Sequence, residues 1–104
     1  MSSSKEYLNF VLGQLSSLEG ISFRAMMGEY IIYYQGKVIG GIYDDRFLIK
    51  QTDAAKRLLP EAPAELPYEG AKEMLLADID DRDLMNILIP AVAGELPKPK
   101  KKTN

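Results

Sequence analysis

The stretch that decides the fold is residues 21–50, ISFRAMMGEYIIYYQGKVIGGIYDDRFLIK. It is rich in β-branched and aromatic residues and is interrupted by short polar or glycine-containing pairs. Such runs predict strands, and connections of about two residues force neighbouring strands to run antiparallel. We therefore expect a four-stranded antiparallel meander, with strands at 21–27, 29–34, 37–43 and 46–50.

Two connections in this stretch have the chemistry of tight turns. Gln35-Gly36 fits a two-residue hairpin loop, because Gly36 is free to adopt a positive φ angle. Asp44-Asp45 fits the next turn, because short carboxylate side chains bond to the nearby backbone and tolerate the left-handed region.

The second and third predicted strands carry signs of close packing. Apolar side chains occupy both faces of 29–34, which indicates a central strand or a sheet that is covered on both sides. Gly40 and Gly41 follow in the next strand, and paired glycines inside a strand predict a bulge or the close approach of another element. A bound ligand is the alternative occupant of the space above them.

An amphipathic helix is predicted before the sheet. Its apolar residues form one stripe at helical spacing: Tyr7, Leu8, Val11, Leu12, Leu15 and Leu18. Ser3 or Ser4 can cap this helix, and Ser3 with Glu6 fits a capping box. Gly20 supplies the stop signal.

A short helix and a fifth strand are predicted after the meander. Thr52 or Asp53 caps a helix at 54–59. Three prolines then mark a loop that returns the chain to the sheet: Pro60, Pro63 and Pro67. The apolar residues of 72–79 fit either a strand or a buried helix, and we take them as a strand because a helix start follows directly.

The last helix is predicted to start at Asp80 with Asp83 and to be kinked or ended by Pro90. It carries more apolar residues than one stripe requires: Leu84, Met85, Ile87, Leu88, Ile89, Ala91, Val92 and the following Leu96. Such an excess predicts either deep burial or a second face that serves self-association as a homodimer.

The order of elements is α-β-β-β-β-α-β-α, which separates strands from helices and is typical of the α+β class. We expect an antiparallel sheet of about five strands with helices packed on it. Residues 1–96 have the size of one domain. Residues 97–104 are rich in lysine and proline, and we expect them to form a flexible tail.

The composition excludes several classes of chemistry. The 104 residues include no cysteine and no histidine. Thiolate nucleophiles and zinc–thiolate sites are therefore absent, as are the commonest general base near neutral pH and the commonest transition-metal ligand. Hydrolases of the Ser-His-Asp and Cys-His types are excluded. We assign no catalytic, cofactor-binding or metal-binding residue.

The charge and hydropathy of the chain argue against nucleic acid and membrane as partners. Four of the 13 basic residues are lysines between 98 and 102, which leaves nine basic against 15 acidic residues in 1–97, a net charge of −6. Such a body repels a phosphate backbone, so direct nucleic-acid binding is not expected. No apolar run approaches the roughly 20 residues that span a bilayer, and no secretory signal pattern is present. We expect a cytoplasmic protein without membrane contact.

Two charged segments have both a binding and a structural interpretation. The acids Asp78, Asp80, Asp81 and Asp83 lack the spacing of a calcium loop, and acids at a helix N-terminus are favoured by capping and by the helix dipole. We interpret them as a helix start. The tail lysines are a weak, sequence-blind signal for nucleic acid or acidic partners, and they also fit a solvated terminus.

The turn around Gly28 is the candidate functional site. Gly28 marks a tight turn or bulge, and Arg24 and Glu29 can pair across it. Met26 and Met27 fit adaptable apolar contacts for a partner. The alternative is a structural turn with core methionines and a surface ion pair.

The residues that follow extend this turn to the pattern of a known family. Arg24-x-Met26-Met27-Gly28-Glu29-Tyr30 precedes the Gly36 hairpin, the Asp44-Asp45 turn, Phe47-Leu48-Ile49-Lys50 and Leu66-Pro67-Tyr68. From about Arg24 to the last helix, the chain resembles the TfoX N-terminal domain family. It departs from the family pattern at Met27, where an aromatic residue is common, and at Glu29, where a second glycine is common.

The resemblance implies an α+β fold of the TfoX-N and YgaC-like type, without established catalytic residues. The family's namesakes regulate bacterial competence genes, which implies a role accessory to transcription. We therefore expect a non-enzymatic module that binds an unknown protein partner. Its candidate interaction surface comprises Arg24, Met27, Gly28, Glu29, Tyr30, Lys50 and Tyr68.

The alternative function is a small-ligand binder or enzyme with a pocket of tyrosine, lysine and arginine side chains. Tyr30, Tyr68, Lys50 and Arg24 converge if the turn and the proline-rich loop meet over one edge of the sheet. A lysine or tyrosine acts as a base near neutral pH only when its pKa is strongly lowered.

Overall fold

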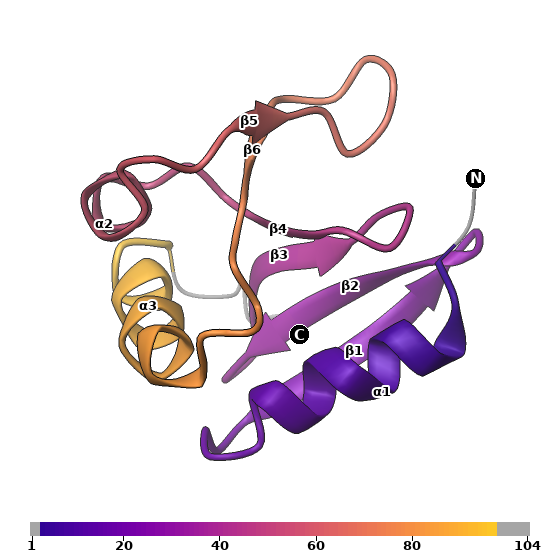
Figure 1. Ribbon diagram of the computed structural model, residues 1–104, viewed down its shortest axis with the longest axis horizontal. Coiled ribbons are helices and arrows are strands. Elements are labelled where there is room, and N and C mark those ends of the chain that lie inside the picture. The colour runs from indigo at the N-terminus through magenta and orange to yellow at the C-terminus, as the bar shows by residue number, and fades with distance from the viewer. Residues whose placement is uncertain (1–2, 98–104) are drawn as a thin grey trace, which may run out of the picture.

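The computed structural model describes residues 3–97 and places three helices on one face of a six-stranded antiparallel sheet (Figure 1). The helices are α1 (Lys5–Gln14), α2 (Asp53–Leu58) and α3 (Arg82–Gly94). The strands are β1 (Ile21–Met26), β2 (Glu29–Tyr34), β3 (Lys37–Ile42), β4 (Phe47–Ile49), β5 (Ala64–Glu65) and β6 (Met74–Leu76). Their spatial order is β1-β2-β3-β4-β6-β5.

The predicted meander is confirmed, because β1 to β4 are neighbours in chain order and each adjacent pair is antiparallel. Each hairpin turns on two residues with positive φ angles: Met27-Gly28, Gln35-Gly36 and Asp44-Asp45. This backbone geometry matches the right-handed twist of the strands that it joins. The second strand, β2, lies between two others, as its two apolar faces indicated.

The sheet has six strands rather than the expected five. The additional strand, β5, is two residues long and lies in the predicted proline-rich loop, where it pairs with β6. A segment this short, close to Pro63 and Pro67, has no alternation that could predict a strand. The predicted strand in 72–79 is confirmed as β6, although it is shorter than expected, and it pairs with β4.

The core lies between the sheet and the helices. Buried apolar side chains of all three helices meet one face of the sheet, with Leu8, Val11, Leu15, Ala55, Leu88 and Val92 against Ile32, Ile42, Phe47, Ile49 and Leu75. None of the helices within residues 3–97 is both long and apolar enough to cross a lipid bilayer.

Burial explains the apolar excess of α3 except at Ile87, which is exposed. This helix packs against β2 and β3 and also against α2. Both of its apolar rows contribute to the core, including Met85, Leu88, Ile89 and Val92. The second face that could have served self-association is therefore an interior face. Pro90 does not end the helix, which continues to Gly94.

The first helix differs from its prediction at both ends. Ser4 caps α1, and its hydroxyl oxygen accepts a hydrogen bond from the Tyr7 N–H at 3.1 Å. The predicted capping box is wrong, because the Ser3 hydroxyl bonds to Glu29 instead. The helix ends at Gln14, before the expected stop at Gly20, and the residues between form turns.

The acidic segment forms the start of α3, as predicted. The Asp81 carboxylate caps the helix by accepting a hydrogen bond from the Leu84 N–H at 3.0 Å. Asp78 accepts one from the Asp80 N–H at 3.2 Å. The predicted flexible tail lies, beyond residue 97, outside the described residues.

Gly40 and Gly41 have no room for a side chain, and the register of β2 against β3 shifts beside them, so the predicted bulge and close packing are confirmed. A β-carbon on Gly40 would overlap the Leu48 carbonyl oxygen. A β-carbon on Gly41 would lie 2.7 Å from both the Tyr30 carbonyl oxygen and the Tyr43 ring. The Tyr43 ring therefore occupies the space above Gly41.

Substitution of Gly40 by alanine tests this packing. We expect G40A to lower the free energy of unfolding by about 1–3 kcal/mol, because the backbone of β4 must move to admit the methyl group. The matched control is G13A in α1, where no atom beyond the adjoining residues and helix backbone lies within 4 Å of the new β-carbon. It should stabilise the protein by up to about 1 kcal/mol through helix propensity. Urea unfolding measures both, and equal effects would contradict the packing.

Candidate functional site

The face of the sheet opposite the helices carries the candidate site, and we call it the open face. Gly41 and Leu48 are cross-strand partners on this face, and Leu48 is buried without belonging to the core under the helices. The Tyr43 ring lies over Gly41, and the Tyr68 ring centroid is 6.1 Å from that of Tyr43. The segment between β5 and β6 therefore reaches over the open face.

A groove of about 770 Å³ lies on this side, between the β1–β2 turn, the β3–β4 turn and the start of the β5–β6 segment. We call it the open-face groove. Its lining residues are Met26, Met27, Glu29, Tyr43, Asp44, Arg46, Leu66, Pro67, Tyr68 and Glu69. Of the seven large apolar side chains exposed in residues 3–97, four line it: Met26, Met27, Leu66 and Tyr68. Exposed apolar surface is thus concentrated here.

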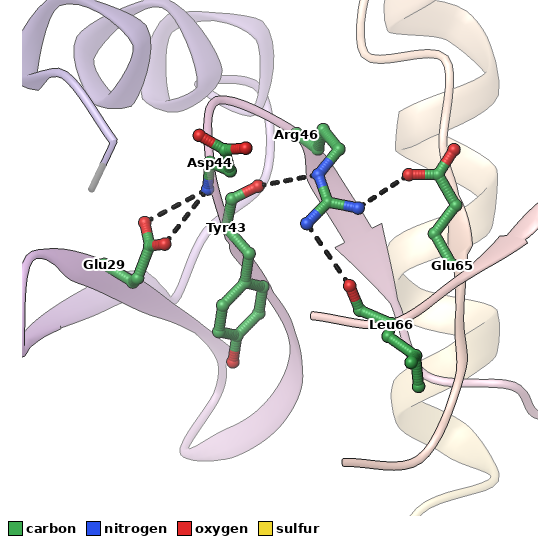
Figure 2. Close-up of polar contacts among 6 residues, drawn as sticks. All are labelled: Glu29, Tyr43, Asp44, Arg46, Glu65 and Leu66. Atoms are coloured by element: carbon green, nitrogen blue, oxygen red, sulfur yellow. Dashed lines mark hydrogen bonds and ion pairs between the residues drawn. The ribbon is translucent and has the colours of Figure 1, made fainter. Parts of the chain in front are cut away.

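Arg46 holds the two sides of the groove together (Figure 2). Its Nη1 donates to Glu65 Oε1 at 2.6 Å and its Nη2 to the Leu66 carbonyl oxygen at 3.2 Å. Its Nε donates to the Tyr43 carbonyl oxygen at 3.0 Å. One guanidinium therefore joins the β3–β4 turn to β5, and the position of Leu66 depends on it.

Glu29 holds the β1–β2 turn beside the β3–β4 turn. Its carboxylate oxygens accept hydrogen bonds from the Asp44 N–H at 3.1 and 3.2 Å, as Figure 2 shows. The Ser3 hydroxyl donates to the same carboxylate at 2.6 Å and accepts from the Asp45 N–H at 2.9 Å. The predicted Arg24–Glu29 ion pair is therefore wrong, because Glu29 bonds elsewhere. The ion pair recorded among residues 3–97 joins Arg46 to Glu65.

Met27 occupies an unfavourable position for its residue type. Its φ angle is 52°, in the left-handed region, which costs an ordinary L-residue about 1–2 kcal/mol. Its side chain is 96% exposed, so burial within this chain does not offset that cost. Met26 is also exposed, and the alternative interpretation of both as core methionines is wrong.

Tyr43 forms the apolar floor of the groove. Burial raises the pKa of its hydroxyl above the usual value of 10.0, and the nearby Tyr68 and Glu29 raise that pKa further. The phenol therefore stays neutral and protonated across the physiological range. It is poorly suited to act as a base, which requires a lowered pKa.

The structure brings some of the predicted surface together and separates the rest. Met27, Glu29 and Tyr68 line the open-face groove. Lys50 lines a neighbouring cavity of about 510 Å³, which shares Tyr43, Pro67 and Tyr68 with the groove.

Three further predicted residues line neither the groove nor the neighbouring cavity. Gly28 completes the turn, and its carbonyl oxygen accepts from the Ser3 N–H at 2.9 Å. Arg24 pairs with Ile31 on the open face but does not line either cavity there. Tyr30 packs against the core on the helix-bearing face. The predicted convergence of Arg24, Tyr30, Lys50 and Tyr68 is therefore wrong, although the turn and the proline-rich loop do meet.

Sequence reasoning missed Arg46 and Tyr43. Arg46 lies 19 residues before its partner Glu65, and no periodic pattern relates them. Tyr43 could have been found, because it follows Gly41 by two residues at the end of a predicted strand. Alternation places such residues on one face, where a large ring fits over a glycine.

Comparison with known proteins identifies the family of the chain. Residues 13–82 match the family model described as the TfoX N-terminal domain, which confirms the resemblance drawn from the sequence. The chain is 32% identical over 102 residues to a Spirochaeta aurantia protein described as "Uncharacterized 12.7 kDa protein in trpE 5'region". That alignment covers 96% of this chain and 89% of the relative. No solved structure matches the chain.

Replacement of Arg46 by lysine tests the clamp between the β3–β4 turn and β5. Lysine keeps the charge but cannot supply the planar fork that makes three bonds at once. We expect R46K to reduce hydrogen-exchange protection of the Leu76 amide, which bonds to the Pro63 carbonyl oxygen at 3.0 Å, by about tenfold. R82K is the control, because Arg82 bonds to Ser16 elsewhere. Unchanged protection in R46K would refute the clamp.

The raised pKa of Tyr43 predicts a loss of stability in alkali. The unfolded chain releases this proton near pH 10, while the folded protein retains it, so the contribution is complete below pH 10 and declines as pH rises through the folded pKa. We expect the free energy of unfolding to fall less steeply above pH 10 in Y43F than in the wild type. Burial also raises the pKa of Tyr7. The free energy of unfolding of Y43F should therefore still fall with pH, because Tyr7 contributes to that slope. Identical slopes would contradict the burial of the Tyr43 hydroxyl.

Proposed function

The chain belongs to the TfoX N-terminal domain family, and from that membership we propose that it is a non-enzymatic protein-interaction module, accessory to transcriptional regulation. Its partner binds in the open-face groove. The observation that carries the proposal is the gathering of exposed Met26, Met27, Leu66 and Tyr68 around one concave surface. A contiguous exposed apolar patch with a polar rim is typical of an interaction site.

Met27 supports a binding role more directly than its neighbours. It carries a backbone cost and gains no burial in this chain, so it stabilises nothing in the isolated protein. Strained residues are concentrated at functional sites. Methionine is also the apolar side chain that adapts best to a partner's surface. Burial of Met27 by a partner supplies the stabilisation that the free protein lacks.

The charges around the groove indicate the chemistry of the partner. Glu29, Asp44 and Glu69 lie at the rim, and the one arginine of the lining is already paired with Glu65. The rim therefore carries an excess of negative charge. A partner segment that presents an apolar side chain next to a lysine or arginine complements it.

Two features support a binding role over a catalytic one. The pKa of Tyr43 is raised, which is the opposite of what a tyrosine base requires. The Arg46 guanidinium bonds to three groups of the protein, so it is not free to bind a substrate.

A small-ligand role is the second candidate. The cavity beside the groove, of about 510 Å³, has Lys50, Lys72 and Tyr68 in its lining. Its volume lies within the range of about 300–1,000 Å³ that small-molecule sites occupy. Two lysines against one acidic residue of the lining, Glu73, favour an anionic ligand there.

Replacement of Met27 by asparagine separates binding from folding. Asparagine tolerates the left-handed region, so M27N should stabilise the turn by up to about 1 kcal/mol while it removes the apolar contact. Q35N is the matched control, because Gln35 has a φ angle of 51° in the β2–β3 turn, outside the groove. Thermal unfolding checks that both variants are at least as stable as the wild type.

Affinity capture from a native bacterial lysate then measures binding. We expect the wild type and Q35N to retain one protein in stoichiometric amount, and M27N to retain several-fold less of it. Because M27N is expected to be stabilised, its loss of binding has no origin in unfolding. Equal retention by M27N would refute the groove as the binding surface. Retention of no protein by the wild type would favour the small-ligand role.

A further inference from the structure

We infer that the outer edge of β1 pairs with the same edge of a second copy of this chain, so that two sheets become one across a twofold axis centred on Phe23. This interface lies outside the open-face groove, so the proposal does not depend on the proposed function. The interface also does not use the second apolar face of α3, which is buried in the core.

The two edges of the sheet are protected differently. At one end, β5 is only two residues long and is flanked by prolines. At the other end, β1 is six residues long and pairs only with β2. Among residues 3–97, no backbone hydrogen bond reaches the outer side of β1. Exposed edges are normally blunted by charged side chains, proline, a bulge or short length, and of these β1 has only the charge of Arg24.

The alternation of hydrogen bonds along β1 shows which of its residues have backbone groups free to bond to another strand. Met26 and Glu29 flank a two-residue turn, and residues in that position exchange both backbone bonds. The bond from the Gln35 N–H to the Gly20 carbonyl oxygen, at 2.8 Å, continues the same phase. Even-numbered residues therefore bond towards β2. The outward N–H and C=O groups belong to Ile21, Phe23 and Ala25.

A second copy complements this edge in one register. When the twofold axis passes beside Phe23, Phe23 of one copy lies opposite Phe23 of the other, Ile21 opposite Ala25, and Ser22 opposite Arg24. The outward backbone N–H and C=O groups of both strands are then hydrogen-bonded, and five positions of each strand are paired. Moving the centre to Arg24 sets two like charges directly opposite, which is destabilising. Moving it to Ser22 leaves only three positions of each strand in the pair.

The side chains beside the edge favour this pairing. Phe23 is 46% exposed on the helix-bearing face, and an aromatic residue opposite an aromatic residue stabilises an antiparallel pair. An apolar groove of about 510 Å³ continues from Phe23 and Ile21 to Leu12 and Leu18 at the end of α1. In Figure 1, α1 runs along β1, and the residues of β1 after Ile21 are exposed.

Charge also favours a second copy at this place. The body of the chain is acidic, with 15 acidic against nine basic residues in 1–97, so most faces repel a copy. Residues 20–28 contain no acidic residue and a single basic one, Arg24. Two acidic copies can therefore approach each other at the β1 edge without repulsion between acidic side chains.

Disulfide crosslinking tests the register, because the chain has no cysteine and each variant carries one thiol. Directly opposed residues in a hydrogen-bonded antiparallel pair have α-carbons about 5.5 Å apart, within the range that a disulfide spans. We expect F23C to form a covalent dimer under mild oxidation about tenfold faster than I87C. Ile87 is 59% exposed on α3 and serves as the matched control. Equal rates would overturn the proposal.

Sedimentation of the full chain tests the association itself. We expect the wild type to be a dimer at micromolar concentration, and F23K to raise the dissociation constant by about tenfold or more. A25P removes an outward N–H that β2 does not use, so it should have the same effect while circular dichroism shows an unchanged fold. A monomeric wild type at millimolar concentration, or a dimer that both variants leave intact, would overturn the proposal.

Discussion

The guanidinium of Arg46 is the interaction on which the open face depends. It bonds to the β3–β4 turn through the Tyr43 carbonyl oxygen, and to the β5 region through Glu65 and Leu66. Arg46 and Glu65 lie 19 residues apart in the sequence. The planar, five-donor fork of arginine satisfies three acceptors in fixed directions at once. The groove is thus a product of long-range polar bonds rather than of the apolar core.

Different interactions therefore stabilise the two faces of the sheet. Under the helices, apolar burial fixes the packing, and it accounts even for the apolar excess of α3. On the open face, two polar clamps, at Arg46 and at Glu29, position apolar side chains that remain exposed. Met27 shows the consequence, because it combines a left-handed backbone with full exposure. Such a surface carries an energetic cost in the free protein.

Local features of the fold could be predicted from the sequence, and long-range ones could not. The hairpins followed from two-residue turn chemistry, and the Gly40-Gly41 pair correctly indicated close packing. The bond between Ser3 and Glu29 joins residues 26 positions apart, so only tertiary structure reveals it. The placement of Tyr30 also required the register of β2, because alternation shows that two faces differ but not which one the helices cover. For these reasons only three of the ten residues that line the groove belong to the predicted surface, and the two polar clamps were not predicted.

The rigidity of the segment from Leu66 to Ala71 decides whether the groove exists before a partner arrives. Backbone ¹⁵N relaxation of the wild-type protein measures this on the picosecond-to-nanosecond timescale. We predict order parameters of about 0.85 for the segment, equal to those of β4 and β6, because Arg46 and the packing of Tyr68 near Tyr43 hold it. Order parameters below about 0.6 would mean that the segment is mobile and that no preformed groove exists.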